Sequence, residues 1–534
     1  MATKKKMLQA AAGVGGVPEG AWDLSYAYYD DPFAWDISTA VYASKSFSVG
    51  AQESVPEGVF FKPDGLKMYV VGSTGDDVNE YSLSTAWDIL SASYIQSFSV
   101  SAQDTLPTDV FFKPDGAKMY VVGDAGNDIN EYNLSTSWDI SSASYLQSFS
   151  VNAQEGNPKG VFFKPDGAKM YVVGLGADAV AEYDLSTAWD ISTSSYLQNF
   201  SVATQDVEPQ AVFFKSDGTK MYVVGENTIN VFEYTLSTAW DVSTASYIQS
   251  FSVFAQEVQP KGIFFKPDGS SFFVVGRDSD TVYQYTLGGF SVAAREASPQ
   301  GLSFKADGTK MYVIGLAGDD VNEYNLSTAW DTSTAAYAGR FVVSSQDSNP
   351  EGMFFKPDGT KMYVVGRTNR SVYEYSLSTA WSVSTASYIA SFSVISQDTD
   401  PVGVSFSSDG IKMYVIGYSS DAVNEYSLST AWDISTASYV QNFSVLAQGS
   451  SPEDLFFKPD GTKFYVIDRG SDYVSEYALS TDWNIATSSY VQNFYIGIQA
   501  TNGTGIFFKD DGTQMFVIGD SKDKVFTYSL GVQE

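Results

Sequence analysis

Residues 59–100, VFFKPDGLKMYVVGSTGDDVNEYSLSTAWDILSASYIQSFSV, decide the fold, because most of the remaining chain repeats them. The stretch contains four runs of aromatic and β-branched residues, VFFK, KMYVVG, VNEYSL and SYIQSFSV, each bounded by Gly, Pro, Asp or Ser. This pattern is typical of short antiparallel strands. In the turn Lys62-Pro63-Asp64-Gly65, proline stands where φ must be about −65° and glycine where φ must be positive, which predicts a tight hairpin.

Ten such units follow one another, each marked by its turn glycine. These glycines are Gly65, Gly116, Gly167, Gly218, Gly269, Gly308, Gly359, Gly410, Gly461 and Gly512. Neighbouring glycines are 51 residues apart, except that 39 residues separate Gly269 from Gly308. A four-stranded unit repeated at a fixed period predicts an all-β protein with a β-propeller fold.

The two ends of the chain complement each other. Residues 28–50 match only the second half of a unit, with Trp35 equivalent to Trp87, whereas the last unit stops after its third strand. An N-terminal strand that completes the last blade leaves no unpaired strand edge in the ring. We therefore expect a β-propeller of ten four-stranded blades over residues 21–534, closed by the N-terminal strand.

The short fifth unit supports this single ring if it has an outer strand of its own. When Leu83 is paired with Phe98 in the full unit, Leu287 can pair with Phe290 across a two-residue Gly-Gly turn.

Two tandem five-bladed propellers are the alternative, with residues 21–287 in one and 288–534 in the other. In that arrangement the N-terminal strand closes the fifth unit, and residues 290–292 close the tenth. A boundary halfway along the chain would also explain why one unit is shorter than the others.

The composition excludes several kinds of active site. The chain contains no Cys and no His, which removes disulfides, thiolate nucleophiles, His-ligated zinc and Ser-His-Asp catalysis. A net charge of −32 disfavours contact with nucleic acid or anionic lipid, and no apolar run approaches the ~18 residues of a transmembrane helix. We expect no nucleic-acid partner, no membrane insertion and no cofactor. The acidic loops also offer too few oxygens for a metal site.

Charged residues that recur in the units are predicted to be scaffold. Lys62 and Glu80 have equivalents in most units, so we expect a ladder of Lys–Glu pairs between strands. Catalytic groups normally break the symmetry of a repeat, and we predict no catalytic residue.

The outer hairpin tip, STAWDISTASY, is the main candidate for ligand binding. It repeats a tryptophan and a tyrosine seven residues apart. The two can form a structural cross-strand pair, or they can serve as platforms on which sugars stack. Repeated weak sites would gain affinity from multivalency. The candidate residues are Trp87, Tyr94, Trp138, Tyr145, Trp189, Tyr196, Trp240 and Tyr247.

The loops from each fourth strand to the next blade are a second candidate. They vary more than the strands, and variable loops on a fixed scaffold often carry binding specificity. Their polar candidates are Gln103, Asp104, Gln154 and Glu155.

Residues 1–20, MATKKKMLQAAAGVGGVPEG, do not fit the repeat. Their apolar stretch is interrupted by Gln9 and by glycines, which is a poor match to a signal peptide. We expect a flexible tail or one that docks onto a larger particle.

The PDG turn, the following KMYVVG run and the VNEYSLSTAWDIST segment resemble the YVTN-type family of β-propeller repeats, over about residues 35–530. The opening MATKKKMLQAAAG is similar to the N-termini of virion proteins of marine tailed phages. The resemblance implies a tail-fibre or decoration protein and adds no catalytic residues, because the repeat family has no shared active site.

These observations predict a non-enzymatic, structural or adhesive protein of a phage particle. Its expected partners are other virion proteins, bound through the N-terminal tail, and a glycan of the host surface. Its expected location is the virion. The alternatives are an extracellular or cell-surface adhesion protein of a bacterium and an enzyme that degrades polysaccharide with paired carboxylates.

Overall fold

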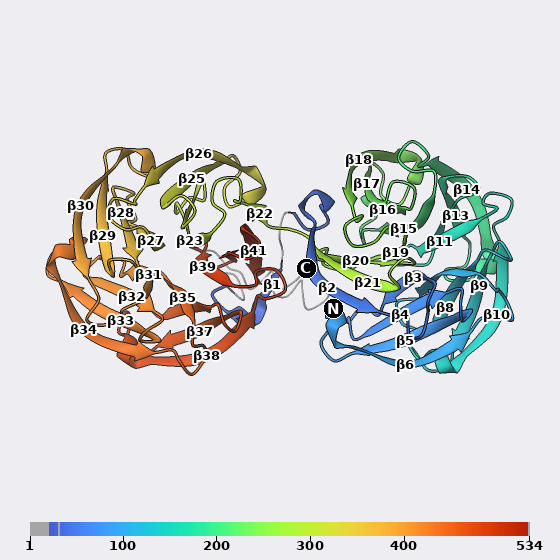
Figure 1. Cartoon of the computed structure of the whole chain (residues 1–534), viewed down its shortest axis with the longest axis horizontal. Helices are drawn as coiled ribbons and strands as arrows, with labels where there is room; N and C mark the ends of the chain where they lie inside the picture. Colours follow the sequence, from blue (N-terminus) through green and yellow to red (C-terminus); the bar gives the residue numbers. More distant parts are fainter. Residues whose placement is uncertain (1–20, 30–32, 532–534) are drawn as a thin grey trace, which may run out of the picture. The chain divides into compact units, whose positions relative to one another are not determined.

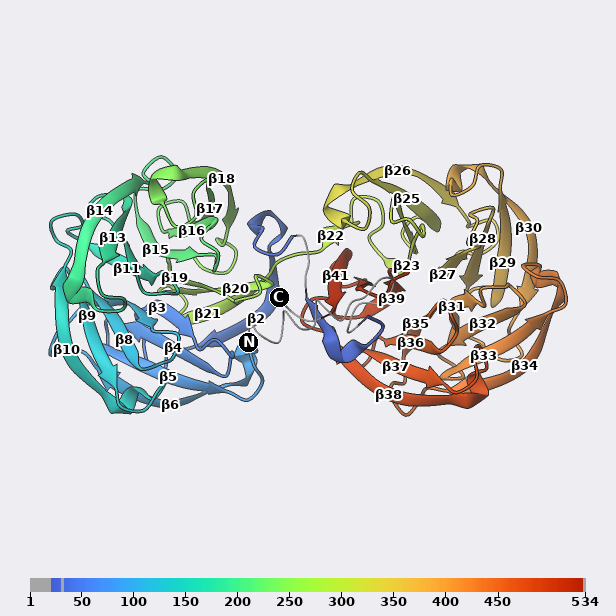
Figure 2. The ribbon, with the colours of Figure 1, turned by 180° about the vertical axis from the view of Figure 1, so that it is seen from behind.

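The structure, a computed structural model, describes residues 21–29 and 33–531. The regular structure in this part of the chain is antiparallel β-sheet with short 3-10 helices, and no α-helix occurs there. The chain divides into two compact units. Residues 34–287 form the first propeller, and residues 288–531, with residues 21–29 and 33, form the second propeller. Figures 1 and 2 show the blades of each unit arranged around an axis of their own.

In the first propeller each blade is a four-stranded sheet, and the strands follow one another from the axis to the rim. The first four blades are formed by β3 (Pro56–Phe61), β4 (Lys67–Gly72), β5 (Asp77–Leu83) and β6 (Ala92–Ser99); β7 (Pro107–Phe112), β8 (Lys118–Gly123), β9 (Asp128–Leu134) and β10 (Ala143–Ser150); β11 (Pro158–Phe163), β12 (Lys169–Gly174), β13 (Ala179–Leu185) and β14 (Ser194–Ser201); and β15 (Pro209–Phe214), β16 (Lys220–Gly225), β17 (Asn230–Leu236) and β18 (Ala245–Ser252). The fifth is formed by β19 (Pro260–Phe265), β20 (Ser271–Gly276), β21 (Thr281–Thr286) and β2 (Val41–Ser48).

The second propeller repeats this plan. Its first four blades are formed by β23 (Pro299–Phe304), β24 (Lys310–Gly315), β25 (Asp320–Leu326) and β26 (Ala335–Val342); β27 (Pro350–Phe355), β28 (Lys361–Gly366), β29 (Ser371–Leu377) and β30 (Ala386–Ser393); β31 (Pro401–Phe406), β32 (Lys412–Gly417), β33 (Ala422–Leu428) and β34 (Ala437–Ser444); and β35 (Pro452–Phe457), β36 (Lys463–Asp468), β37 (Tyr473–Leu479) and β38 (Ser488–Tyr495). The fifth contains β39 (Gly503–Phe508), β40 (Gln514–Gly519), β41 (Lys524–Leu530), β1 (Ala27–Tyr29) and β22 (Phe290–Ser291).

A short 3-10 helix precedes the outer strand at each hairpin tip. An N-cap side chain usually starts it, as where Asp139 accepts a hydrogen bond of 3.0 Å from the Ser141 amide. None of the helices in the described residues is long and apolar enough to cross a membrane. The 3-10 helices are η1 (Leu24–Tyr26), η2 (Ile37–Thr39), η3 (Ile89–Ser91), η4 (Ile140–Ser142), η5 (Ile191–Thr193), η6 (Val242–Thr244), η7 (Thr332–Thr334), η8 (Val383–Thr385), η9 (Ile434–Thr436) and η10 (Ile485–Thr487).

The predicted hairpin turn is confirmed. Gly65 has a φ of +72°, and its amide donates a hydrogen bond of 2.8 Å to the Lys62 carbonyl. The indole of Trp87 lies directly over this glycine, where a Cβ atom would come within 2.4 Å of the ring. The turn therefore needs glycine both for its backbone angle and for the packing of the tryptophan.

The innermost strands contact their neighbours cyclically in each propeller. In the first, β19 returns to β3, and in the second, β39 returns to β23. The prediction of ten four-stranded propeller blades is confirmed, but the single ring is replaced by the alternative of two rings of five. The reason is that β2 pairs with β21 of the fifth unit, so the N-terminal strand closes the first propeller.

The last blade of the second propeller receives its outer strand from two distant segments. Ala27 pairs with Leu530 at one end of β41, and Phe290 pairs with Val525 at the other. The predicted pairing of Leu287 with Phe290 is therefore wrong. The boundary at residue 21 also moves, because residues 21–29 and Phe33 belong to the second propeller and the first begins at Ala34.

Two other expectations from the sequence need correction. Leu83 pairs with Ala92, not with Phe98, because the hairpin tip folds into a turn and η3 instead of extending the ladder. The partner of Glu80 is Lys67 and not Lys62: the Lys67 ammonium forms an ion pair of 2.5 Å with the Glu80 carboxylate. Lys62 pairs instead with an aspartate of its own turn.

The expected docking tail, residues 1–20, lies outside the described residues.

Candidate functional site

The axis of the first propeller is filled by aromatic rings. The fifth residue of each innermost strand, which we call the plug position, is phenylalanine in all five blades. Neighbouring rings pack edge to face with centroids 5.1–5.4 Å apart, and the circle closes on itself. Such pairs are stabilising beyond the area that they bury. The five residues are Phe60, Phe111, Phe162, Phe213 and Phe264.

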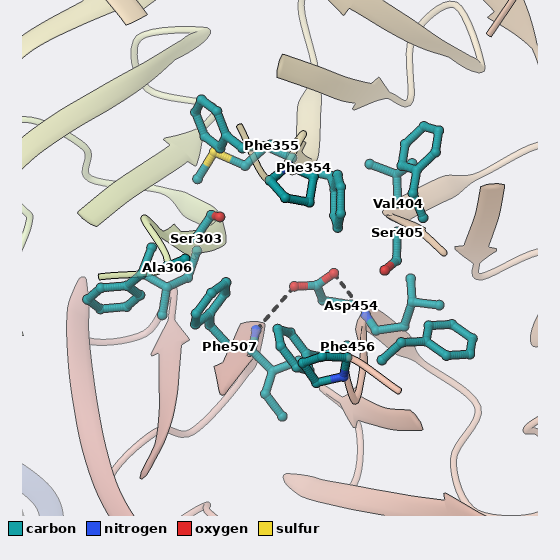
Figure 3. A pocket seen from close by; sticks show the side chains of 18 of the residues that line it. Ser303, Ala306, Phe354, Phe355, Val404, Ser405, Asp454, Phe456 and Phe507 are labelled. Carbon is teal, nitrogen blue, oxygen red and sulfur yellow. Dashed lines mark hydrogen bonds between the residues drawn. The ribbon is translucent and has the colours of Figure 1, made fainter. Parts of the chain in front are cut away.

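The second propeller interrupts this plug. Its plug positions hold Phe354, Phe456 and Phe507, but Ser303 and Ser405 replace the other two rings. A cavity of about 390 Å³ opens here, and Figure 3 shows both serine side chains on its wall. Loss of two phenyl groups explains the space, because the rest of the inner strand pattern is kept.

The cavity walls are mainly apolar and extend to the hairpin turns. Phe355, Met353 and Trp381 are among the wall residues, and the lining reaches Pro357 and Asp510, which follow the ends of inner strands. The lining begins at the third residue of an inner strand. The cavity therefore occupies the part of the channel between that level and the turns.

A carboxylate projects into this cavity from the third residue of an inner strand, which we call the axial position. Seven of the ten axial positions are glycine, since a Cβ at Gly160, for example, would lie 2.8 Å from the Cα of Ala211 in the next blade. The other three are Ala211, Asp109 and Asp454. Figure 3 shows the Asp454 carboxylate in the cavity, with the Ser405 side chain beside it.

Among the described residues, backbone amides hold the Asp454 carboxylate. Its carboxylate accepts hydrogen bonds of 2.8 Å from the Leu455 amide and 3.2 Å from the Ile506 amide of the next blade. Burial raises the pKa of Asp454 to about 7, and the two amide bonds only partly oppose this rise. A carboxyl group that titrates near neutrality can accept and return a proton under physiological conditions.

Two further buried carboxyl groups lie at the other end of the inner strands. Burial raises the pKa of Glu351 to about 7 and that of Glu453 to about 8. Arg469 lies 3.6 Å from Glu453, and the Tyr418 hydroxyl donates to the same carboxylate. These partners fix Glu453 as part of a polar layer. No group of three or more carboxylates in residues 21–29 and 33–531 is arranged to hold a metal ion.

The structure separates the predicted Trp–Tyr pairs. Trp138 is only 9% exposed and stacks on Phe112 of its own blade and on Phe60 and Tyr69 of the preceding one. Its carbonyl accepts a hydrogen bond of 2.8 Å from the Tyr69 hydroxyl. Trp189 and Trp240 are equally buried, and Trp87 is half-buried. These indoles therefore pack between neighbouring blades and stabilise their contact.

The predicted tyrosines do lie on the surface. Tyr94 is 43% exposed and packs edge to face on Tyr81, with ring centroids 5.8 Å apart. Tyr145, Tyr196 and Tyr247 repeat this arrangement. Their part in ligand binding stays a prediction.

The polar loop candidates serve mainly to hold the loops. Asp104 is buried and accepts hydrogen bonds of 2.7 Å from the amides of Leu106 and Gly126. Glu155 is buried and bonded to backbone amides in the same way. Gln103 accepts from a buried tyrosine hydroxyl, and Gln154 is half-buried.

Sequence reasoning missed Asp454, Ser303 and Ser405. The signal was present, since DLF replaces the usual GVF of the inner strand at Asp454, and LSF and VSF replace the usual VFF at Ser303 and Ser405. The expectation that functional groups break the repeat symmetry was not applied to the inner strands. Only the structure places the three departures around one cavity.

Comparison with known proteins gives a match between part of the chain and an enzyme family. Residues 150–329, about a third of the chain, match a family described as lactonase, 7-bladed beta-propeller. A search of curated proteins gave no match.

Solved structures with similarity to the chain include a protein from Lactobacillus plantarum (15% identity, TM-score 0.29, covering 71% of this chain and 94% of the other). Two more are putative 6-phosphogluconolactonases. The one from Bacteroides uniformis has 14% identity and a TM-score of 0.28, covering 69% and 92% of the two chains. The one from Bacteroides fragilis has 14% identity and a TM-score of 0.26, covering 64% and 84%. Scores this low carry no argument of their own.

The family match corrects the predicted function. A phage structural protein without enzymatic activity was expected, whereas the match is to a lactonase family, and nothing in it supports the resemblance to phage virion proteins. The prediction that the protein is not an enzyme is likewise overturned. The propeller and repeat character of the resemblance is confirmed.

Proposed function

We propose that the second propeller is a lactonase, a hydrolase that opens cyclic esters in its axial cavity. The observation that carries this proposal is the Asp454 carboxylate, which projects into an apolar cavity and has a pKa of about 7. The match of residues 150–329 to a lactonase family supports it and includes Ser303 of the cavity wall.

Asp454 would act as the general base. Its carboxylate takes a proton from a water molecule as the water oxygen attacks the lactone carbonyl carbon. The tetrahedral intermediate then collapses, the bond from the carbonyl carbon to the ring oxygen breaks, and the protonated Asp454 returns the proton to that oxygen. The product is the open hydroxy acid, and the carboxylate is regenerated.

The surroundings of Asp454 suit this role. The two backbone amides fix the orientation of the carboxylate. Neither amide carries a full positive charge, which would lower the basicity of the carboxylate much more strongly. The Ser405 side chain beside Asp454 places a hydroxyl donor where the negative charge of the intermediate develops. Apolar walls exclude bulk water from the reacting groups.

Hydrolysis of unsubstituted and alkyl-substituted γ- and δ-lactones by the purified full chain, followed by titration of the released acid, tests the proposal. We expect Asp454→Asn to lower kcat/KM by at least about 100-fold, the usual contribution of a general base. Asp109→Asn is the matched control, because Asp109 has the same backbone environment beside the filled axis of the first propeller. Equal activity of the two variants, or no lactone opened above the uncatalysed rate, would refute it.

A further inference from the structure

The first propeller shows what the cavity of the second propeller lacks. At the same level of the axis, Phe60 and Phe162 occupy the plug positions that correspond to Ser303 and Ser405. The missing volume is that of two phenyl groups, and the three remaining plug rings, Phe354, Phe456 and Phe507, still border it. An apolar group of the ligand can therefore fill this space as the phenyl groups do in the first propeller.

The charges of the cavity select against anions. Its charged lining residues are Asp454 and Asp510, and no Lys or Arg belongs to the lining that the structure describes. The lysines of the neighbouring turns are paired, as in Lys458 with Asp460 at 2.8 Å and Lys509 with Asp511 at 2.9 Å. A phosphorylated or carboxylated ligand would enter a site of like charge without a cation to receive it.

The two serines differ in how many blades separate them from the Asp454 carboxylate. Ser405 is on β31, whose blade adjoins the β35 blade of Asp454, whereas Ser303 is on β23, which adjoins neither. A carbonyl group that Asp454 and Ser405 both reach leaves the space at Ser303 for the rest of the molecule. Ser303 and Ser405 thus have separate tasks in the same cavity.

We propose that the substrate is an uncharged lactone with an apolar substituent, which lies in the space left by Ser303, while the lactone ring lies between Ser405 and Asp454. This inference rests on the proposed function and adds the substrate class to it. Ser303 is then a specificity-determining residue, since its small side chain makes room for the substituent.

Binding of non-hydrolysable lactams with substituents of increasing alkyl length, measured by calorimetry on the full chain, tests the substrate class without hydrolysis. We expect affinity to rise by up to about fourfold for each buried methylene. Ser303→Phe should remove this gain, because it restores the ring found in the first propeller, and Ser303→Ala should keep it. A correctly folded Ser303→Phe protein, judged by circular dichroism, that still binds long-chain lactams as the native chain does would overturn the inference.

The same lactone series separates this inference from the proposed function. If Asp454-dependent hydrolysis is found but is faster for phosphorylated sugar lactones than for alkyl lactones, the function stands and the substrate class is wrong. If lactams bind with the expected chain-length dependence but no lactone is opened, the class of ligand stands and the lactonase activity is refuted.

Discussion

Asp109 and Asp454 occupy the same axial position in different propellers, and each carboxylate bridges two blades through backbone amides. Asp109 accepts hydrogen bonds of 2.8 Å from Val110 and 2.9 Å from Val161, as Asp454 does from the equivalent residues of its own propeller. Burial raises the pKa of both groups to about 7. A ligand can reach only one of the two carboxylates, because five phenyl rings fill the axis beside Asp109, whereas a cavity borders Asp454.

Lactone hydrolysis should follow the ionisation of Asp454. Because the unprotonated carboxylate is the base, kcat/KM should rise with pH, reach half its maximum near pH 7 and level off above it. A pH–rate profile of the full chain measures this. A profile that stays flat through neutrality would exclude Asp454 as the base.

Ionisation of Asp109 should lower the stability of the fold as the pH rises, whereas ionisation of Asp454 raises the activity. The pKa of Asp109 is raised in the folded protein from 3.8 to about 7, so the folded state binds the proton more tightly and its stability falls as pH rises through this interval. Relative to Asp109→Asn, the native chain should lose up to about 4 kcal/mol of its free energy of unfolding as the pH rises from 3.8 to about 7. Urea unfolding of both proteins across the interval gives this difference, and a constant difference would contradict the raised pKa.

Two tryptophans close together in the sequence should stabilise different propellers. Trp22 stacks on Phe508 of the second propeller, with centroids 5.6 Å apart, and Trp35 stacks on Phe265 of the first at 5.4 Å. Truncation of a buried aromatic side chain typically costs about 3–5 kcal/mol. Hydrogen exchange followed by mass spectrometry should show loss of protection only in the second propeller for Trp22→Ala.

The matched variant Trp35→Ala should lose protection only within residues 34–287. Loss in both propellers with either variant would mean that the two rings do not unfold separately.

The axial glycine Gly160 should not tolerate a side chain. A methyl group at Gly160 would approach the Cα of Ala211 within 2.8 Å, so Gly160→Ala should destabilise the first propeller by about 1–3 kcal/mol. Gly339 has no atom within 4 Å of its virtual Cβ, and Gly339→Ala is the control that should be neutral. Thermal unfolding distinguishes them, and equal midpoints would show that the inner strands can shift apart.

Local patterns were sufficient for the blade but not for the ring. The turn at Gly65 and the alternation of the strands are properties of neighbouring residues, so the sequence reveals them directly. Trp87 and Tyr94 were expected to face each other because a simple hairpin would pair them. The turn and η3 instead bury the tryptophan against another blade, a contact that depends on residues far away in the chain.

By itself, the sequence determined that the protein is built from ten four-stranded β units, because turn chemistry and strand periodicity are local. Only the tertiary structure decided that five blades close each ring, since closure depends on how near the inner strands can approach at positions such as Gly58. It also decided where the candidate site lies. Ser405 and Asp454 are 49 residues apart, and Ser303 is more than 51 residues from either of them. Only the circular arrangement of the blades brings the three residues around one cavity.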